Sequence, residues 1–252
     1  MTPENIAPEA YLRAVKVRRD KISSFDNYPF SLPVVRHLEE FSLHPAVTFL
    51  VGENGSGKST LLEAIAVAWG FNPEGGTKNF RFQTRASHSS LHEYLRLVKA
   101  PTRAHDGFFL RAESMFNLAS EIEHLDEEPG GPPVIGSYGG RSLHEQSHGE
   151  SFFAVMMHRF GGNGFYVLDE PEAALSPSRQ LAMISRLHDL VKMRSQFLIA
   201  THSPILMAYP NAWIYQISTH GIERVRLEDT EHYMVAKRFL NDPHQQLARL
   251  LS

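Results

Sequence analysis

Residues 52–60 read GENGSGKST and follow the pattern G-x-x-x-x-G-K-[ST]. In this pattern the glycines let the backbone turn tightly, so that successive N–H groups point inward and bind phosphate oxygens. We expect Lys58, at an exposed loop end, to reach the β- and γ-phosphates of a nucleotide, and Ser59 to ligate Mg²⁺. Every residue of the stretch is a candidate nucleotide ligand, Thr60 through the α-phosphate: Gly52, Glu53, Asn54, Gly55, Ser56, Gly57, Lys58, Ser59 and Thr60.

Two adjacent carboxylates, Asp169 and Glu170, follow four apolar residues in the run FYVLDEPE at 165–172. The carboxyl ends of strands form the usual ligand edge of an α/β sheet. Asp169 is therefore the candidate to hold Mg²⁺, and Glu170 the candidate to polarise an attacking water, because hydrolysis needs a base within reach of that water. An isolated Asp-Glu pair is usually a solvated turn, but this pair accompanies a phosphate loop, so we favour the functional interpretation.

The stretch LHEQSHGESFF at 143–153 permits three interpretations. His144, Glu145 and His148 spell H-E-x-x-H, which on a helix can hold zinc. Residues 147–150 spell S-H-G-E, either a capping box or a helix start whose free N–H groups attract phosphate. Glycines flank the zinc pattern on both sides and weaken a helix there, and no third ligand follows. We therefore expect no zinc, and the other two interpretations are compatible.

Strands and helices must bring these motifs together. Apolar runs predict strands at 46–51, 164–169 and 195–202, and periodicity predicts helices at 57–69, 150–160 and 177–192. Their alternation indicates an α/β fold with a largely parallel sheet covered on both faces. Between about 85 and 144 the strand signal fades, so we expect one domain over 1–252 with an inserted helical subdomain at roughly 85–150.

Composition limits the classes of protein. The 252 residues are 42% hydrophobic, enough for one sizeable core. The net charge of −3 gives no global positive field for nucleic acid, although a local basic patch remains possible. The absence of cysteine excludes disulfides and thiolate metal sites. With no long apolar run and no secretion signal, we expect a cytoplasmic chain without a membrane segment of its own.

With these motifs in place, the sequence resembles an ATP-binding cassette (ABC) ATPase, and more specifically the soluble SMC/RecF-like branch. The resemblance implies a P-loop NTPase fold with an ABC-type mixed sheet and an inserted helical subdomain, and ATP and Mg²⁺ as cofactors. It identifies Gln83 as the Q-loop residue that senses Mg²⁺ and the attacking water, and His202 as the switch histidine that contacts the γ-phosphate. It also implies a D-loop at 174–177 and a signature at 147–150, with Ser147, Gly149 and Glu150 as nucleotide ligands.

The chain departs from the family pattern in two places. The signature reads S-H-G-E where S-G-G-Q is expected, so that His148 replaces a glycine while Ser147 and Gly149 are retained. An aromatic residue that stacks on adenine is expected upstream of the phosphate loop, and Phe25 and Tyr28 are the candidates.

In ABC proteins the signature serves the γ-phosphate held by the partner subunit. One phosphate loop and one signature therefore imply a head-to-tail homodimer with two ATP molecules at its interface. We expect an ATPase whose closing and reopening act on an unidentified macromolecule, with DNA maintenance or defence as one such role. The alternatives are the nucleotide-binding subunit of an ABC transporter, a non-hydrolysing ATP-gated interaction module and, more distantly, a small-molecule kinase. No long coiled coil is present, which excludes an SMC-like tether but leaves DNA or a partner protein open.

Overall fold

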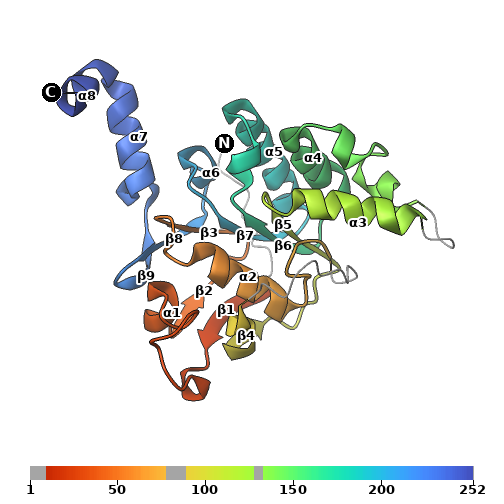
Figure 1. The fold of residues 1–252 in the computed structure, drawn as a ribbon, viewed down its shortest axis with the longest axis horizontal. Helices are drawn as coiled ribbons and strands as arrows, with labels where there is room; N and C mark the ends of the chain where they lie inside the picture. The colour runs from red at the N-terminus through yellow and green to blue at the C-terminus, as the bar shows by residue number, and fades with distance from the viewer. Residues whose placement is uncertain (1–9, 78–88, 128–132, 252) are drawn as a thin grey trace.

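A six-stranded mixed sheet forms the centre of the computed structural model, which describes residues 10–77, 89–127 and 133–251 (Figure 1). Its strand order is β5-β6-β7-β3-β8-β9. The strands from β5 to β8 are parallel, and β9 is antiparallel to β8. The bounds are β3 (Val47–Gly52), β5 (Asp106–Arg111), β6 (Gly164–Asp169), β7 (Gln196–Ala200), β8 (Trp213–Ser218) and β9 (Gly221–Val225). The α/β class and the mixed sheet expected from the sequence are therefore confirmed.

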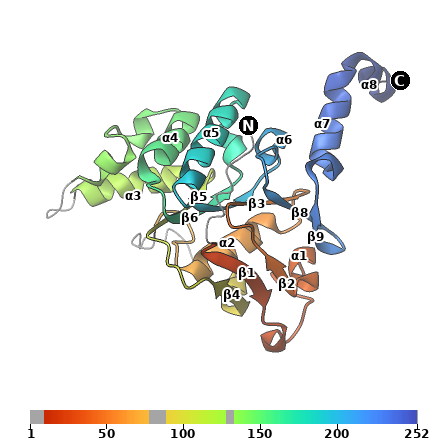
Figure 2. The ribbon, with the colours of Figure 1, turned by 180° about the vertical axis from the view of Figure 1, so that it is seen from behind.

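A smaller antiparallel sheet has the order β2-β1-β4 and consists of β1 (Leu12–Val17), β2 (Glu40–Ser42) and β4 (Leu95–Lys99). Helix α2 (Lys58–Trp69) lies between this sheet and the central one (Figure 2). Its Leu61, Leu62 and Ile65 are fully buried in one cluster with side chains of both sheets. Apolar contacts on both sides fix the helix, and with it the phosphate loop that precedes it.

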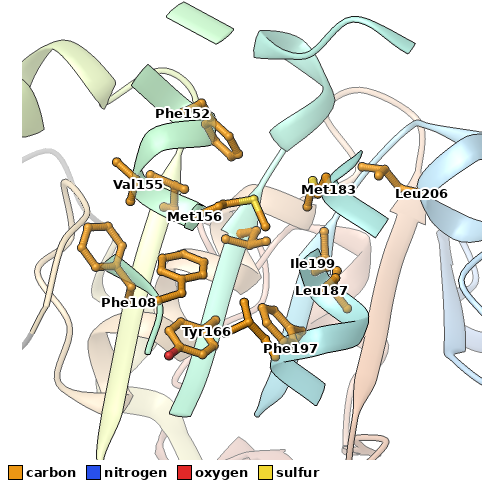
Figure 3. Close-up of a cluster of buried hydrophobic side chains, with 14 of the residues drawn as sticks. Phe108, Phe152, Val155, Met156, Tyr166, Met183, Leu187, Phe197, Ile199 and Leu206 are labelled. Atoms are coloured by element: carbon orange, nitrogen blue, oxygen red, sulfur yellow. The ribbon is translucent and has the colours of Figure 1, made fainter. Parts of the chain in front are cut away.

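Helices cover the opposite face of the central sheet: α3 (Met115–Glu127), α4 (His148–Ala154), α5 (Pro177–Lys192) and α6 (Pro204–Met207). Figure 3 shows Phe108, Tyr166 and Phe197, from three neighbouring strands, facing Phe152 and Met183 of these helices. All five side chains are fully buried. Each such burial contributes roughly 1.5–3 kcal/mol, so this layer holds in place β6, the strand that leads to the acidic pair.

The remaining helices are α1 (Pro33–His37), α7 (Glu231–Asn241) and α8 (Pro243–Leu250). Helices α7 and α8 form a C-terminal arm that projects from the body (Figure 1). Short 3-10 turns lie at Arg19–Lys21, Ser90–Tyr94, Val134–Tyr138, Leu143–Glu145, Pro171–Ala174 and Leu227–Asp229, and a π turn at Val155–Arg159. Among the described residues, the helices are too short or too polar to cross a lipid bilayer.

The strands and helices predicted around the motifs are present, but the stretch between 85 and 144 needs correction. It contains β4 and β5, where helical pieces were expected, and its long helix begins only at Met115. Strand β4 is partly exposed and β5 is an edge strand with polar residues at both ends, so neither has the continuous apolar run of a central strand. The single-domain organisation with a helical subdomain at 85–150 stays a prediction.

Candidate nucleotide site

The phosphate loop joins the buried strand β3 to the first turn of α2. Gly57 precedes α2 with φ +96°, and a Cβ there would lie 2.7 Å from Cγ1 of Val34, so both conformation and space require glycine. No side chain caps the start of α2. Its first N–H groups are therefore free to bind an anion, aided by the helix dipole.

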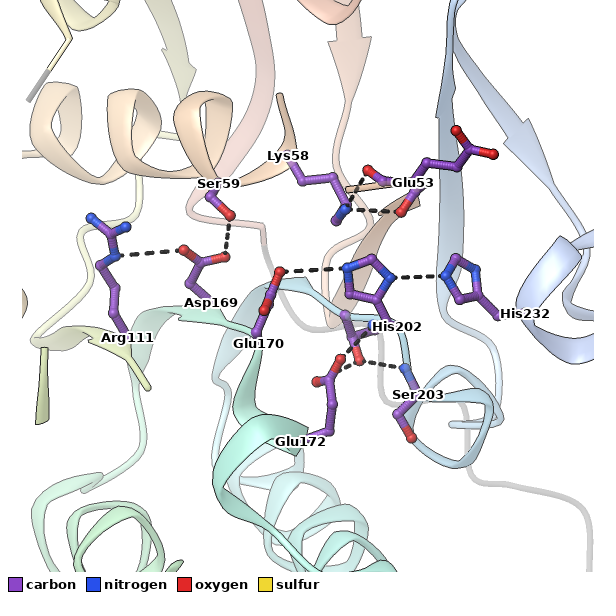
Figure 4. A network of polar contacts seen from close by, with 12 residues as sticks. Glu53, Lys58, Ser59, Arg111, Asp169, Glu170, Glu172, His202, Ser203 and His232 are labelled. Atoms are coloured by element: carbon purple, nitrogen blue, oxygen red, sulfur yellow. Dashed lines mark hydrogen bonds and ion pairs between the residues drawn. The ribbon is translucent and has the colours of Figure 1, made fainter. Parts of the chain in front are cut away.

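Lys58 lies at the mouth of this loop and is only 4% exposed. Its ammonium group donates to the carbonyl oxygens of Gly52 at 2.8 Å and Glu53 at 2.9 Å (Figure 4). Burial lowers the pKa of Lys58, and the nearby carboxylate of Glu170 opposes this effect. The expectation of an exposed lysine was wrong, because the loop closes around its side chain.

Ser59 and Asp169 face each other across the site. The hydroxyl of Ser59 donates to Oδ1 of Asp169 at 3.1 Å. Burial raises the pKa of Asp169 to about 6, while the Arg111 guanidinium acts in the opposite direction. A hydroxyl oxygen and a buried carboxylate are hard oxygen ligands of the kind that Mg²⁺ prefers, so the pair predicted to hold Mg²⁺ is brought together.

Arg111 was not among the sequence candidates. It ends β5 and pairs in register with Asp169, with Nε 3.5 Å from Oδ2 of Asp169 and Nη1 2.6 Å from Oε2 of Glu63. This cation offsets two largely buried carboxylates. The only sequence signal was a basic residue directly after the apolar run FFL, which is too common to single it out.

We expect Arg111→Met to lower the free energy of unfolding by roughly 3 kcal/mol, because it leaves Glu63 and Asp169 without their cation. Urea unfolding with an unchanged m-value measures this loss. Arg96→Met, at an exposed position of β4, is the matched control and should have little effect. Adding Asp169→Asn to Arg111→Met should restore part of the stability, and equal stability of Arg111→Met and the control would contradict the assigned ion pairs.

Glu170, the second carboxylate of the acidic pair, lies next to His202. Glu170 adopts a left-handed conformation, φ 49° and ψ 52°, and its backbone N–H donates to the carbonyl of Ala200. Its Oε1 lies 3.4 Å from Nε2 of His202. A non-glycine residue in this conformation is unusual, and such strain is concentrated at functional sites. The carboxylate of this residue points toward His202, the predicted switch histidine.

The loop after β7 carries His202 and is held by a carboxylate that the sequence did not identify. Glu172 accepts from Oγ1 of Thr201 at 2.7 Å and from the backbone N–H of His202. Burial raises the pKa of Glu172, which these hydrogen bonds oppose. Burial lowers the pKa of His202, and the nearby Lys58 lowers it further.

Within the described part of the chain, two buried polar atoms near the loop make no hydrogen bond: the hydroxyl oxygen of Ser56, and Nε2 of His202, although Oε1 of Glu170 lies 3.4 Å from the latter. Such groups cost free energy unless a ligand or water satisfies them. Both belong to residues that the sequence assigns to phosphate binding. A phosphate at the start of α2 fits the residues present, since it would accept hydrogen bonds that they otherwise lack.

The predicted signature lies at the start of α4, where the side chains of Ser147 and Glu150 are hydrogen-bonded to each other. Glu150 accepts hydrogen bonds from the hydroxyl of Ser147 at 2.7 Å and from its backbone N–H at 3.0 Å, which hold the pKa of Glu150 below its usual value. A Cβ at Gly149 would lie 2.5 Å from the carbonyl oxygen of Ala174. Glycine therefore lets α4 pack closely against the predicted D-loop.

The zinc interpretation lacks its required geometry. His144 belongs to the 3-10 turn Leu143–Glu145, Gln146 is extended, and His148 opens α4. The two imidazoles are therefore not one turn apart on a single helix. His144 instead contacts Oγ of Ser120 at 3.0 Å through its Nε2.

The residues predicted to stack on adenine, Phe25 and Tyr28, do not line the cavity beside the phosphate loop. A cavity of about 440 Å³ beside the phosphate loop is lined in part by Pro33, Gln216 and Thr219. The lining residues that the structure describes include neither Phe25, which lies under the guanidinium of Arg19, nor Tyr28, which is 63% exposed. Gln83 lies outside the described residues, so its predicted role is untested.

Comparisons with known proteins support the fold. Residues 21–102 match the AAA_23 family of AAA domains, and no curated protein matches the sequence. The structure is similar to cbiO1 from Clostridium perfringens, part of the ABC transporter complex cbiONQ, with 16% identity, a TM-score of 0.50 and coverage of 96% of this chain and 99% of that one. For the SMC head domain from Thermotoga maritima the identity is 17% and the TM-score 0.45, with coverage of 86% of this chain and 98% of that one. For MJ1267, an ATP-binding cassette of an ABC transporter in its ADP conformation, the identity is 19% and the TM-score 0.47, with coverage of 82% of this chain and 89% of that one.

Identities this low show the fold alone, and the fold is that of an ABC-type ATPase domain. The resemblance deduced from the motifs is confirmed at this level.

Proposed function

We propose that this chain is a Mg²⁺-dependent ATPase that closes as a head-to-tail homodimer on ATP and reopens after hydrolysis. One observation carries the proposal: residues from three separate segments, Ser59, Asp169 and His202, converge beside the free N-terminus of α2 (Figure 4). Glu170 lies between the last two. A structural role for the phosphate-loop pattern would not require this convergence.

The charges of the site favour a nucleotide that arrives with a cation. Asp169, Glu170 and Glu172 all lie close enough to Lys58 to act on its pKa. Three carboxylates repel a bare triphosphate. Ser59 and Asp169 would hold Mg²⁺, which supplies charge neutralisation at the β- and γ-phosphates when bound.

Glu170 is the candidate base for hydrolysis. Its carboxylate takes a proton from water as the water oxygen bonds to the γ-phosphorus and the bond from that phosphorus to the β,γ-bridging oxygen breaks. The phosphoryl group leaves as inorganic phosphate, and ADP keeps the bridging oxygen. The Nε2 of His202 faces Glu170, and we assign to it a hydrogen bond to a γ-phosphate oxygen.

The second half of each site would come from the partner chain. The hydroxyl of Ser147 is exposed at the start of α4 and donates to Glu150, so it must turn away from this carboxylate to reach a partner's γ-phosphate. Ser147, Gly149 and Glu150 then act on a nucleotide held by the other phosphate loop.

DNA and a partner protein are the two candidates for the macromolecule on which the dimer acts. A transporter subunit is the alternative, favoured by the fold shared with cbiO1. Binding of the purified chain to a membrane-spanning partner protein would favour this alternative. A non-hydrolysing ATP-gated interaction module is the second alternative. The presence of Glu170, a candidate base for hydrolysis, argues against it.

Release of inorganic phosphate from ATP tests the proposal. We expect turnover with Mg²⁺ and none above background with EDTA, together with much weaker ATP binding in EDTA by calorimetry. Tight binding of Mg-ATP without phosphate release would replace the proposal with the non-hydrolysing module. Equal ATP binding with and without Mg²⁺ would contradict the assigned roles of Ser59 and Asp169.

A further inference from the structure

The switch histidine has a second histidine as its neighbour. Nδ1 of His202 lies 2.8 Å from Nε2 of His232 (Figure 4), and the two rings meet edge to face with centroids 4.9 Å apart. His232 belongs to α7, the first helix of the C-terminal arm. No sequence motif pointed to it, because the two histidines are thirty residues apart.

The start of α7 holds His232 in place independently of His202. Thr230 is fully buried and caps the helix, accepting from the backbone N–H of Tyr233 and donating to the carbonyl of Leu227 at 2.7 Å. His232 is thus in a fixed first turn, next to α6, which follows His202 in sequence. The backbone of both segments therefore brings the two side chains within reach of each other.

Only one proton lies between the two facing nitrogens, since a neutral imidazole has one donor and one acceptor. If His202 donated from Nδ1, its Nε2 would present a lone pair to the Glu170 carboxylate 3.4 Å away, which is repulsive. If His232 donates from Nε2, then His202 accepts at Nδ1 and carries its proton on Nε2. That proton faces the Glu170 carboxylate, and under the proposed function it is the donor to a γ-phosphate oxygen.

Neutral rings fit the electrostatics of the site. Burial lowers the pKa of His202, as does Lys58, and burial together with His202 lowers the pKa of His232. The Glu170 carboxylate acts in the opposite direction on the pKa of His202, but the net shift of both rings favours the neutral form, which keeps a single proton. The partner of one nitrogen then decides which nitrogen of a histidine carries that proton.

We propose that His232 is a positioning residue, whose Nε2–H donates to Nδ1 of His202 and so holds the switch histidine with its Nε2–H aimed at the γ-phosphate. This inference rests on the proposed ATPase function. It assigns to the C-terminal arm a part in the nucleotide site. His232 acts only through His202 and is not a catalytic residue.

Variants of His232 test the role in turnover. We expect His232→Leu to lower kcat about tenfold, the size of one lost hydrogen bond, with KM for ATP changed less than twofold. His232→Gln should recover most of the rate, because its side-chain N–H can donate where Nε2–H did. His244→Leu, at an exposed position on α8 of the same arm, should behave as wild type. Equal losses in His232→Leu and His232→Gln, or a loss confined to KM, would overturn the inference.

The tautomer of His202 gives a readout that does not depend on hydrolysis. In ¹⁵N-histidine-labelled protein, with the signals assigned through His202→Gln, we expect the Nε2–H tautomer of His202 in wild type and in His232→Gln, and a mixture of tautomers in His232→Leu. An Nδ1–H tautomer in wild type would overturn the positioning role. If the wild-type protein shows the expected tautomers but releases no phosphate, the ATPase proposal fails while the positioning of His202 by His232 stands.

Discussion

Replacing Glu170 with glutamine should slow ATP hydrolysis by roughly 100-fold or more while ATP binding is retained. Glutamine keeps the size of the side chain but cannot take a proton from water. The backbone of Glu170 is fixed by its hydrogen bond to Ala200, so the amide should occupy the place of the carboxylate. Phosphate release measures the rate, and calorimetry with Mg-ATP measures the affinity.

Glu223→Gln is the matched control for this loss, because Glu223 is an exposed carboxylate on β9. It should hydrolyse ATP as wild type does. A Glu170→Gln variant that hydrolyses within a fewfold of this control would show that another group takes the proton. The assignment of Glu170 as the base would then be wrong.

Replacing Lys58 with alanine should weaken ATP binding by about 100-fold or more and abolish hydrolysis. The ammonium group is the cation of the phosphate loop, and charge-assisted hydrogen bonds to two phosphates account for an effect of this size. Its present bonds to the carbonyls of Gly52 and Glu53 are local. We therefore expect the fold to persist, with a loss of only about 1–2 kcal/mol of stability.

Circular dichroism and thermal unfolding separate loss of binding from loss of fold in Lys58→Ala. Lys192→Ala, at an exposed position at the end of α5, removes the same charge elsewhere and should leave ATP binding unchanged. Unaltered ATP affinity in a folded Lys58→Ala protein would contradict the phosphate-loop assignment.

Local patterns in the sequence were sufficient to predict those parts of the site whose residues are close together in the chain. The phosphate loop needs only its glycines and the strand and helix beside it, and Asp169 ends a buried strand whose apolar run is continuous. Helix α5 shows the expected periodicity and begins at Pro177, capped by Ser176. In these elements the residues that decide the structure are neighbours in the chain.

The remaining parts of the site depend on contacts between distant segments. Arg111 reaches Asp169 because β5 pairs with β6 in parallel register, and no local pattern specifies that pairing. Glu172 and His232 belong to the site only because the loop after β7 passes between them. The small sheet was missed for the same reason, since β1 pairs with β4 across a long separation and β4 shows only weak alternation of buried and exposed residues.

The central claim is that two chains close on two nucleotides. The molar mass of the Glu170→Gln protein in solution with Mg-ATP tests this claim most directly. Size exclusion with light scattering should give a dimer with Mg-ATP and a smaller or weaker species with ADP. Adding Ser147→Arg should abolish the dimer without preventing ATP binding, because a long side chain then occupies the start of α4. Adding Ser23→Arg, an exposed serine far from α4 in sequence, should leave the dimer intact. A Glu170→Gln/Ser147→Arg protein that dimerises as well as Glu170→Gln alone would reduce residues 147–150 to a helix cap and contradict the shared ATP site.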